Sequence, residues 1–319
     1  MDKSYIVTKV VENELVAQNT YRMRMACPEL AKSFRPGQFC MIRKPGSHDP
    51  LLGRPFAIYD SWFVNESETF EDVDALTSSY ASMSDNDTET YGGVDVMYLV
   101  VGKATAGFAE LQPGQPIEIW GPLGNGFSID NSAKHLILLA GGIGQTPFLS
   151  LVKKIRMETI LDHILHQPGP FFRHKSESSP ALKITLCYGA RSKDAFAGLE
   201  DFKNWNVDIS LTTVDGTAPD GYKCRQGFAT DPMKEIFESE PAEGLFVCAC
   251  GPRPMLIAAQ KLMNQYSVRG QMSLETPMAC GLGICFTCVA KIQDDSGAWD
   301  YKRTCKEGPV FDAKRILWD

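Results

Sequence analysis

The amino-acid sequence predicts an α+β protein of three domains: an antiparallel β-barrel, a parallel α/β unit and a small C-terminal domain rich in cysteine. Three observations predict this organisation. Short strand-like segments of alternating polarity fill residues 1–130, longer alternating β and α segments fill residues 131–270, and four cysteines interspersed with glycines follow in residues 271–319. A chain of 319 residues is long enough for two domains and a small third.

Composition and charge narrow the classes of function. A net charge of −7 gives no sign of a nucleic-acid-binding protein. The most apolar stretch, HLILLAGGIGQTPFLSLV, is interrupted by three glycines and a proline, which argues against a membrane span. The N-terminus lacks the apolar core of a signal peptide. Six of the ten cysteines are scattered along the chain, so we expect a reduced, cytoplasmic protein.

The first domain has the pattern of a small antiparallel barrel. It begins with two strands within residues 4–26, which we expect to meet at a turn formed by residues 12–14. Further strands follow at QFCMIRK, RPFAIY and VDVMYLVVGK, with one short helix, FAELQ, after the last of them. Residues 61–95 are rich in Ser, Thr, Asp and Glu and are interpreted as an insertion between two strands.

Two stretches of this barrel carry residues that suit a flavin. Arg54 stands at the start of RPFAIY, where a guanidinium can meet a phosphate or a ring oxygen while the strand backbone faces the ring edge. Ordinary edge-strand packing is the alternative. Ala104 and Thr105 open the short helix, whose N-terminus can seat a pyrophosphate. The alternative here is a plain helix with Thr105 as its N-cap.

The second domain shows the alternation of a nucleotide-binding unit. The apolar strand HLILLAGG leads into GGIGQTP, where Gly142 and Gly144 let the backbone approach a pyrophosphate and Pro147 suits the first turn of a helix. Cys250 ends another strand, so we expect it to line the same crevice and treat it as the candidate catalytic residue; a buried small hydrophobe is the alternative. Arg191 ends a third strand and can meet a nucleotide or form a surface ion pair.

Residues 157–180 interrupt the second domain and are interpreted as another insertion. Within them, His163 and His166 have the H-x-x-H spacing of metal ligands. No third ligand lies nearby in the sequence, so two polar residues on a helix face are the favoured interpretation.

Four cysteines organise the third domain. Cys280, Cys285 and Cys288 have C-x4-C-x2-C spacing, and Cys305 follows after sixteen intervening residues. The glycines of the loop permit tight wrapping with N–H groups turned toward sulfur. This is the ligand pattern of a plant-type 2Fe–2S site. Zinc usually takes two C-x2-C pairs, of which only one is present, and four buried structural cysteines would explain neither the spacing nor the glycines.

The order of these three parts resembles the ferredoxin–NADP reductase superfamily across nearly the whole chain. Within it, MACGLGICFTC and YKRTCKEGPVF closely resemble the electron transfer subunits of two-protein dihydroorotate dehydrogenases. The resemblance implies FAD, one 2Fe–2S cluster and NAD(H). It also implies a hetero-oligomer with a catalytic subunit that carries FMN and oxidises dihydroorotate in pyrimidine biosynthesis. FAD exchanges both hydrides and single electrons, so it is expected between the cluster and NAD(H).

The resemblance also assigns cofactor residues one by one. The flavin motif falls on Arg54, Pro55, Phe56 and Ala57, and the second flavin stretch on Met97, Tyr98, Leu99, Ala104 and Thr105. The nucleotide loop falls on Gly142, Gly144 and Pro147, and the cluster ligands fall on Cys280, Cys285, Cys288 and Cys305. The chain departs from the family pattern at Ala57, where a Ser or Thr hydroxyl is usual, and at Ala104, where Gly is favoured.

Other interpretations stay open at this point. Small subunits of electron-bifurcating NAD(P)H:ferredoxin oxidoreductases and of sulfide dehydrogenases share the architecture, although several have Asp in place of the first cluster cysteine, here Cys280. A stand-alone NAD(P)H reductase that feeds a diffusible acceptor would have no stable partner. A regulatory or zinc-binding protein that has kept only the fold would be colourless. Arg191 and Lys193 leave a contact to the 2′-phosphate of NADPH open.

Overall fold

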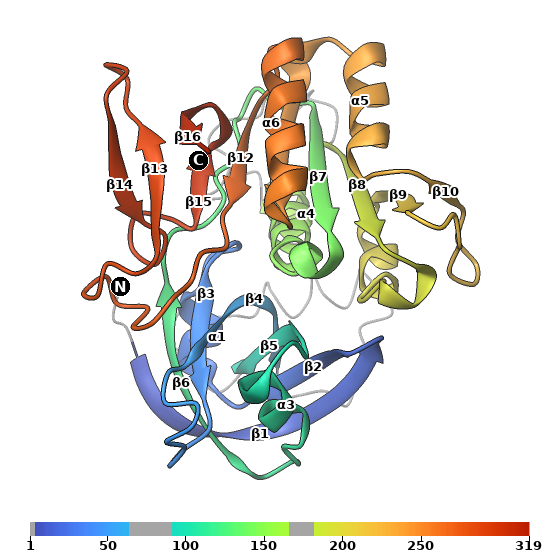
Figure 1. The fold of residues 1–319 in the computed structure, drawn as a ribbon. Coiled ribbons are helices and arrows are strands. Elements are labelled where there is room, and N and C mark those ends of the chain that lie inside the picture. Colours follow the sequence, from blue (N-terminus) through green and yellow to red (C-terminus); the bar gives the residue numbers. More distant parts are fainter. Residues whose placement is uncertain (1–3, 64–90, 166–181, 319) are drawn as a thin grey trace.

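The computed structural model describes residues 4–63, 91–165 and 182–318. These residues form a closed β-barrel, a seven-stranded sheet with helices on both faces, and a three-stranded C-terminal sheet (Figure 1). The predicted fold class is therefore confirmed. Most of the predicted insertion at 61–95 and the last part of the one at 157–180 lie outside the described residues.

The first domain is a six-stranded antiparallel barrel in the order β1-β2-β5-β4-β3-β6. Its strands are β1 (Ser4–Ala17), β2 (Thr20–Met25), β3 (Phe39–Arg43), β4 (Arg54–Phe63), β5 (Tyr91–Leu99) and β6 (Pro116–Leu123). Its helices are α1 (Pro28–Ser33) and α3 (Lys103–Ala109). Inward-facing residues such as Met25, Ile58 and Val96 fill the barrel and have no exposed surface.

The turn predicted at residues 12–14 is wrong. Those residues lie inside β1, and the chain reverses at Asn19, which takes a positive φ of 53°. Asn tolerates this left-handed conformation better than most residues. Asn13 instead donates its amide to the carbonyl oxygens of Phe108 and Leu111, at 2.9 and 3.0 Å, and so ties β1 to the end of α3.

The second domain is a sheet in the order β10-β9-β8-β7-β11-β12-β15, parallel except for the last strand. Its strands are β7 (His135–Gly141), β8 (Lys183–Ala190), β9 (Asp208–Thr213), β10 (Cys224–Gln226), β11 (Leu245–Cys250), β12 (Arg269–Ser273) and β15 (Val310–Asp312). Its helices are α4 (Phe148–Leu165), α5 (Thr230–Ser239) and α6 (Arg253–Tyr266). Short 3-10 turns occur at η1 (Gly142–Gln145), η2 (Lys193–Ala195), η3 (Glu200–Trp205), η4 (Ala242–Gly244) and η5 (Ala313–Arg315).

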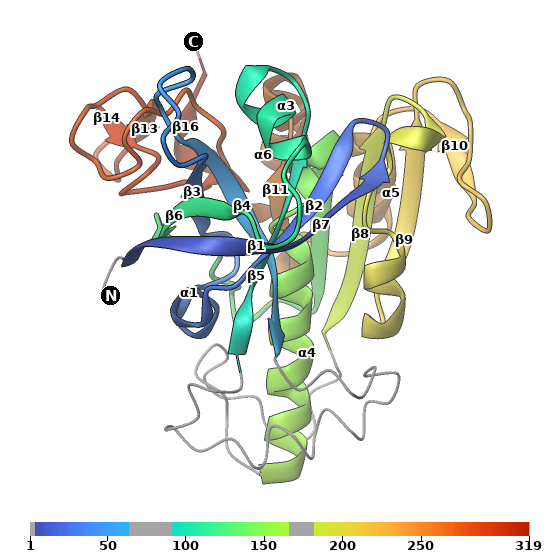
Figure 2. The ribbon, with the colours of Figure 1, turned by 90° about the horizontal axis from the view of Figure 1, so that it is seen from below.

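Strand β7 is buried on both faces. Leu136 and Leu138 face the core that contains α4, whereas Ile137 and Leu139 face the core that contains α5 and α6. Figure 2 shows these helices on opposite sides of the sheet. A parallel strand that is covered on both faces reads as a continuous apolar run, as HLILLAGG does. None of the helices in the described ranges combines the length and apolar character that a bilayer-spanning segment requires.

The C-terminal segment divides between two sheets. Strands β13 (Val289–Gln293), β14 (Trp299–Arg303) and β16 (Ile316–Leu317) form an antiparallel sheet in the order β14-β13-β16. Between β14 and β16 in the chain, β15 pairs with β12 and completes the edge of the second domain's sheet. The predicted limit between residues 270 and 271 falls inside β12, so the cysteine-bearing tail is joined to the second domain by strand pairing.

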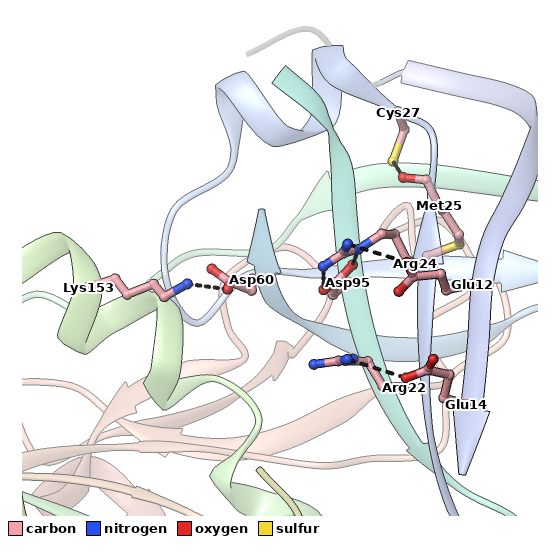
Figure 3. Close-up of polar contacts among 9 residues, drawn as sticks. All are labelled: Glu12, Glu14, Arg22, Arg24, Met25, Cys27, Asp60, Asp95 and Lys153. Carbon is pink, nitrogen blue, oxygen red and sulfur yellow. Dashed lines mark hydrogen bonds and ion pairs between the residues drawn. The ribbon is translucent and has the colours of Figure 1, made fainter. Parts of the chain in front are cut away.

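The barrel and the second domain meet at β4. Lys153 of α4 pairs with Asp60 of β4 (Figure 3), and the neighbouring Tyr59 donates its hydroxyl to Asp201. Tyr59 is 1% exposed, and burial, reinforced by the charge of Asp201, raises its pKa well above the usual value. The hydroxyl therefore stays protonated and acts as a donor. These contacts fix the barrel against the second domain.

An ion-pair group lies beside this interface (Figure 3). Arg24 of β2 donates to Asp95 of β5 through Nε at 3.0 Å and Nη2 at 3.2 Å, and it lies 3.7 Å from Glu12. Burial raises the pKa of Asp95 to about 6, against the lowering effect of Arg24. Asp95 is therefore ionised at neutral pH, and its bidentate ion pair with Arg24 holds β2 against β5.

Candidate functional site

The cysteine loop between β12 and β13 lies against the barrel. Trp120 of β6 donates its indole N–H to the carbonyl oxygen of Cys280 at 3.2 Å. Gly281 has a φ of +71°, and a Cβ there would lie 2.6 Å from Cγ of Met41. Glycine is required both by this backbone conformation and by the close approach. Because Met41 pairs with Pro55 across β3 and β4, the loop lies one strand away from β4, which carries the predicted flavin motif.

The four thiols lie in two pairs. Cys285 is exposed, and hydrogen bonds from Thr287, whose hydroxyl lies 3.3 Å from Sγ, and then from Cys280 lower its pKa to about 6. Cys305 is fully buried, and burial, followed by the neighbouring thiol of Cys288, raises its pKa to about 12. By burial, Cys280 and Cys285 form a pair near the surface, and Cys288 and Cys305 form a pair in the interior.

This arrangement suits a two-iron cluster. A 2Fe–2S cluster takes two thiolates on each iron, which matches the two pairs. The N–H of Leu282 also donates to Sγ of Cys280 at 3.3 Å, the kind of bond that stabilises ligating sulfur. The residues present therefore fit the predicted cluster.

The predicted flavin residues come together on β4, β5 and α3. Phe56 and Tyr98 form an aromatic group with Phe108 of α3, with ring centroids 5.7 to 6.1 Å apart. Tyr98 is buried and donates its hydroxyl to Asn13 at 2.9 Å. Met97, the preceding residue, lies in the core shared with the second domain, as the alternation of a strand requires.

Arg54 stands half-buried at the start of β4. Its Nη1 donates to the carbonyl oxygens of Leu52 at 2.8 Å and Gly53 at 3.1 Å. Both bonds use one nitrogen, so within the described part of the chain Nε and Nη2 keep donors for an anion. Pro55 and Ala57 follow on the same strand and are likewise half-buried. The assignment of these residues to a flavin stays a prediction.

Helix α3 begins at Lys103, and its N-cap is Gly102 rather than Thr105, so the alternative of a Thr105 cap is wrong. The Thr105 hydroxyl accepts hydrogen bonds from the N–H groups of Val101 and Gly102, at 3.0 and 3.2 Å. It also donates to the carbonyl oxygen of Gly102. Thr105 thus shapes the turn itself, and Ala104 beside it is buried. Leu99, at the end of β5, is 38% exposed.

The glycine loop of the second domain lies at the carboxyl edge of the sheet. Gly142 has a φ of +54°, and apart from its chain neighbours no described residue comes within 4 Å of the place of a Cβ. A Cβ on Gly144 would lie 2.2 Å from the carbonyl oxygen of Cys250, so the structure brings together the loop and the strand end that the sequence placed in one crevice. Pro147 directly precedes α4, and Arg191 is exposed just beyond β8 at the same edge.

The chemistry of Cys250 is that of a neutral thiol. Burial, with a contribution from the charge of Glu275, raises its pKa to about 12, while Ser273 has the opposite effect. A thiol with this pKa is neither a nucleophile nor a base at neutral pH. Hydride transfer between nicotinamide and flavin needs neither. The catalytic assignment of Cys250 stays a prediction that rests on its position alone.

Sequence reasoning missed two residues between the predicted sites. Gln145 is fully buried and donates its amide to Sδ of Met97 at 3.3 Å, while its Oε1 has no partner among the described residues. The sequence did carry a signal for Gln145, because a polar side chain stands there between an apolar strand and an apolar helix. Asp201, which binds Tyr59, gave no signal because 142 positions separate the two residues in the chain.

Comparisons with known proteins match both halves of this site. A family model described as the iron-sulfur cluster binding domain of dihydroorotate dehydrogenase B matches residues 275–317, and one described as an oxidoreductase NAD-binding domain matches residues 138–261. The dihydroorotate dehydrogenase B (NAD(+)) electron transfer subunit of Caldanaerobacter subterraneus subsp. tengcongensis is 30% identical over 97% of this chain and 97% of that protein. The subunit of the same name from Desulforamulus reducens is 28% identical over 98% of this chain and 97% of that protein.

Solved structures show the same fold. The structure of an NADH-dependent reduced ferredoxin–NADP oxidoreductase aligns with a TM-score of 0.68 at 23% identity, over 98% of this chain and 90% of that one. Phthalate dioxygenase reductase aligns with a TM-score of 0.52 at 16% identity, over 94% and 76% of the two chains. The relatives that match along their whole length decide the family: this chain belongs to the electron transfer subunits of dihydroorotate dehydrogenase B.

Proposed function

We propose that this chain is the electron transfer subunit of a two-protein dihydroorotate dehydrogenase, and that it passes electrons from an FMN-containing catalytic subunit to NAD⁺ in the cytoplasm. The observation that carries the proposal is the contact between the cysteine loop and the barrel, made by Trp120 on Cys280 and by Gly281 on Met41. The contact puts the loop on β3 and β6, and β3 pairs with β4, which carries the predicted flavin motif. Single-electron exchange between a flavin and a cluster requires such closeness.

The residues of this chain position the redox groups and need perform no acid–base chemistry. When bound, FAD supplies exchange of both hydrides and single electrons, and a 2Fe–2S cluster supplies single-electron exchange. The four thiolates would hold the irons, and Arg54 has N–H groups, unused by the described residues, that could meet an anionic oxygen. Gly142 and Gly144 let the backbone approach a dinucleotide, while Cys250 closes the end of β11 against that loop.

The cysteine loop offers the surface on which the catalytic subunit would dock. Leu282, Ile284 and Phe286 lie between the cysteines of the loop and are 41%, 76% and 60% exposed. Phe286 takes a positive φ of 56°, which is unfavourable for a bulky residue, and its ring lies 4.7 Å from the guanidinium of Arg303. Grouped apolar side chains that stay exposed in this way mark an interaction site.

We expect Ile284→Asp to weaken binding to the FMN-containing subunit by about 100-fold, because a buried apolar anchor would be replaced by a charge that must be desolvated. Leu15→Asp is the matched control, since Leu15 is 63% exposed at the far end of β1. Isothermal titration of each purified variant with the catalytic subunit measures the affinity. Equal losses in the two variants, or none in Ile284→Asp, would place the docking surface elsewhere.

Reconstitution tests the function itself. The chain, loaded with FAD and cluster, is combined anaerobically with the FMN-containing subunit encoded in the same organism. We expect NAD⁺ reduction by dihydroorotate with both proteins present and none with either alone. Full NADH turnover with a small acceptor and no complex would favour a stand-alone reductase. Stable assembly with a ferredoxin-reducing or sulfide-oxidising subunit instead would favour the small subunit of an electron-bifurcating oxidoreductase or a sulfide dehydrogenase.

A further inference from the structure

Arg303, the last residue of β14, links the two halves of the cysteine site. Its Nη1 donates to the carbonyl oxygen of Gly283 at 2.8 Å, in the middle of the loop that carries three of the thiols. Its Nε lies 3.1 Å from Oε2 of Glu307, its Nη2 binds the other carboxylate oxygen, and its backbone N–H donates to Oε2 at 2.8 Å. Arg303 therefore sits between the loop and the turn that contains Cys305.

Close packing fixes the guanidinium in this place. Gly283 has a φ of +82°, and a Cβ there would lie 3.2 Å from Cδ of Lys306 and 3.7 Å from Nη1 of Arg303. The ring of Phe286 covers the guanidinium at 4.7 Å, and the Arg303 side chain is 20% exposed. A cation held by two hydrogen-bonded partners and an aromatic face is ordered, unlike a charge at the end of a free side chain.

The turn that begins at Arg303 lies beside the interior pair of thiols. The N–H of Thr304 donates to the carbonyl oxygen of Cys288 at 2.7 Å, so the turn that follows Arg303 is fastened to the strand of Cys288. Arg303 is therefore next to the residue that binds Cys288 and two residues from Cys305, which places its charge near both interior thiols.

We propose that Arg303 is a positioning residue that closes the cysteine loop and, through its charge, sets the reduction potential of the cluster. The proposal rests on the proposed function, because it requires the 2Fe–2S cluster. One-electron reduction adds one negative charge to a cluster that already carries four thiolates. A fixed cation beside Cys288 and Cys305 stabilises that added charge and favours reduction, while the carboxylate of Glu307 partly cancels the effect.

Two charge-neutralising variants of opposite sign test this. We expect Arg303→Gln to lower the ratio of reduced to oxidised cluster about tenfold at a given ambient potential, equal to about 59 mV for a one-electron couple. Glu307→Gln is expected to raise that ratio. Lys302→Gln is the matched control, because Lys302 carries the same charge on the other face of β14, pairs with Asp300 at 3.0 Å and should leave the ratio unchanged.

The measurement is a redox titration of the FAD-loaded protein, with the reduced cluster followed by electron paramagnetic resonance. If Arg303 and Glu307 only held the loop in place, the reduction potential of the cluster would shift in the same direction in Arg303→Gln and Glu307→Gln, or in neither. Either result overturns the proposal. A shift in Lys302→Gln as large as that in Arg303→Gln overturns it as well. If Arg303→Gln loses iron, Arg303→Lys replaces it, because it keeps the charge; its cluster must have the reduction potential of the wild type. The reduction potential of Glu307→Gln must still be higher than that of the wild type.

Iron and labile sulfide are counted in every sample before titration. A wild-type protein that holds neither would contradict the proposed function itself. A fully loaded cluster whose potential ignores Arg303 and Glu307 would contradict only the role of this pair.

Discussion

Replacing Gly144 by alanine is expected to destabilise the second domain by about 3 kcal/mol and to abolish NAD(H) binding. The added Cβ would lie 2.2 Å from the carbonyl oxygen of Cys250 and 2.7 Å from Cα of Gly251. Both are backbone atoms, so no side chain can rotate away. The end of β11 would have to move away from η1, and this edge of the sheet is where a dinucleotide is expected to bind.

Gly142→Ala is the matched control for this prediction. Gly142 has a φ of +54°, and the place of its Cβ is open, so the substitution should cost about 1 kcal/mol for the left-handed conformation alone. Thermal unfolding followed by circular dichroism, together with titration of NADH into both variants, separates the clash at Gly144 from the cost of the left-handed conformation at Gly142. If both substitutions proved equally mild, the loop would not pack against β11 as described here.

The contrast between these glycines shows which part of a motif the sequence can predict. GGIGQTP after an apolar strand predicts a dinucleotide turn, because few other needs place two glycines between a buried strand and a helix. The sequence does not tell which glycine serves the left-handed turn and which one makes room for another strand. That division depends on Gly251, more than a hundred positions away, and only the folded sheet brings the two together.

The same distinction between local pattern and long-range packing applies to the fold. Strand β7 and the cysteine loop were predictable because periodicity and ligand spacing are local properties of the chain. The reversal at Asn19 was missed because the polar residues 12–14 look like a turn, whereas the barrel uses Asn13 to bind α3. The pairing of β15 with β12 was missed because a strand of three residues, Val310–Asp312, carries too little pattern to predict its partner.

The limit of prediction from local sequence is clearest at the four cysteines of the site. The four candidate ligands follow from spacing, but their division into a surface pair and an interior pair follows from burial, which spacing does not encode. Arg303 was missed for a similar reason: its contact with Gly283 spans twenty positions and has no recurring interval. Local rules therefore predict which residues bind a cofactor, and long-range packing decides how each of them is tuned.

Cys285→Ser is expected to abolish the cluster, with iron and labile sulfide falling from about two of each per chain to near zero. Hydrogen bonds from Thr287 and Cys280 lower the pKa of Cys285 to about 6, so the wild-type protein offers a thiolate at neutral pH. A serine hydroxyl stays protonated there and is a poor ligand for iron that selects soft thiolates. FAD content should stay near the wild-type level, since Cys285 is exposed and the predicted flavin residues lie on β4, β5 and α3.

Cys224→Ser provides the control, because Cys224 is a partly exposed cysteine of β10, at the opposite edge of the second domain's sheet. Visible absorption of the anaerobically purified proteins, with metal and flavin analysis, measures both cofactors in one sample. Cys224→Ser should match the wild type in each. Loss of flavin along with iron in Cys285→Ser would mean that the cysteine loop, through Cys280 on Trp120 and Gly281 on Met41, supports the flavin site as well as the cluster. Retention of iron in Cys285→Ser would contradict the assignment of Cys285 as a ligand of one of the two irons.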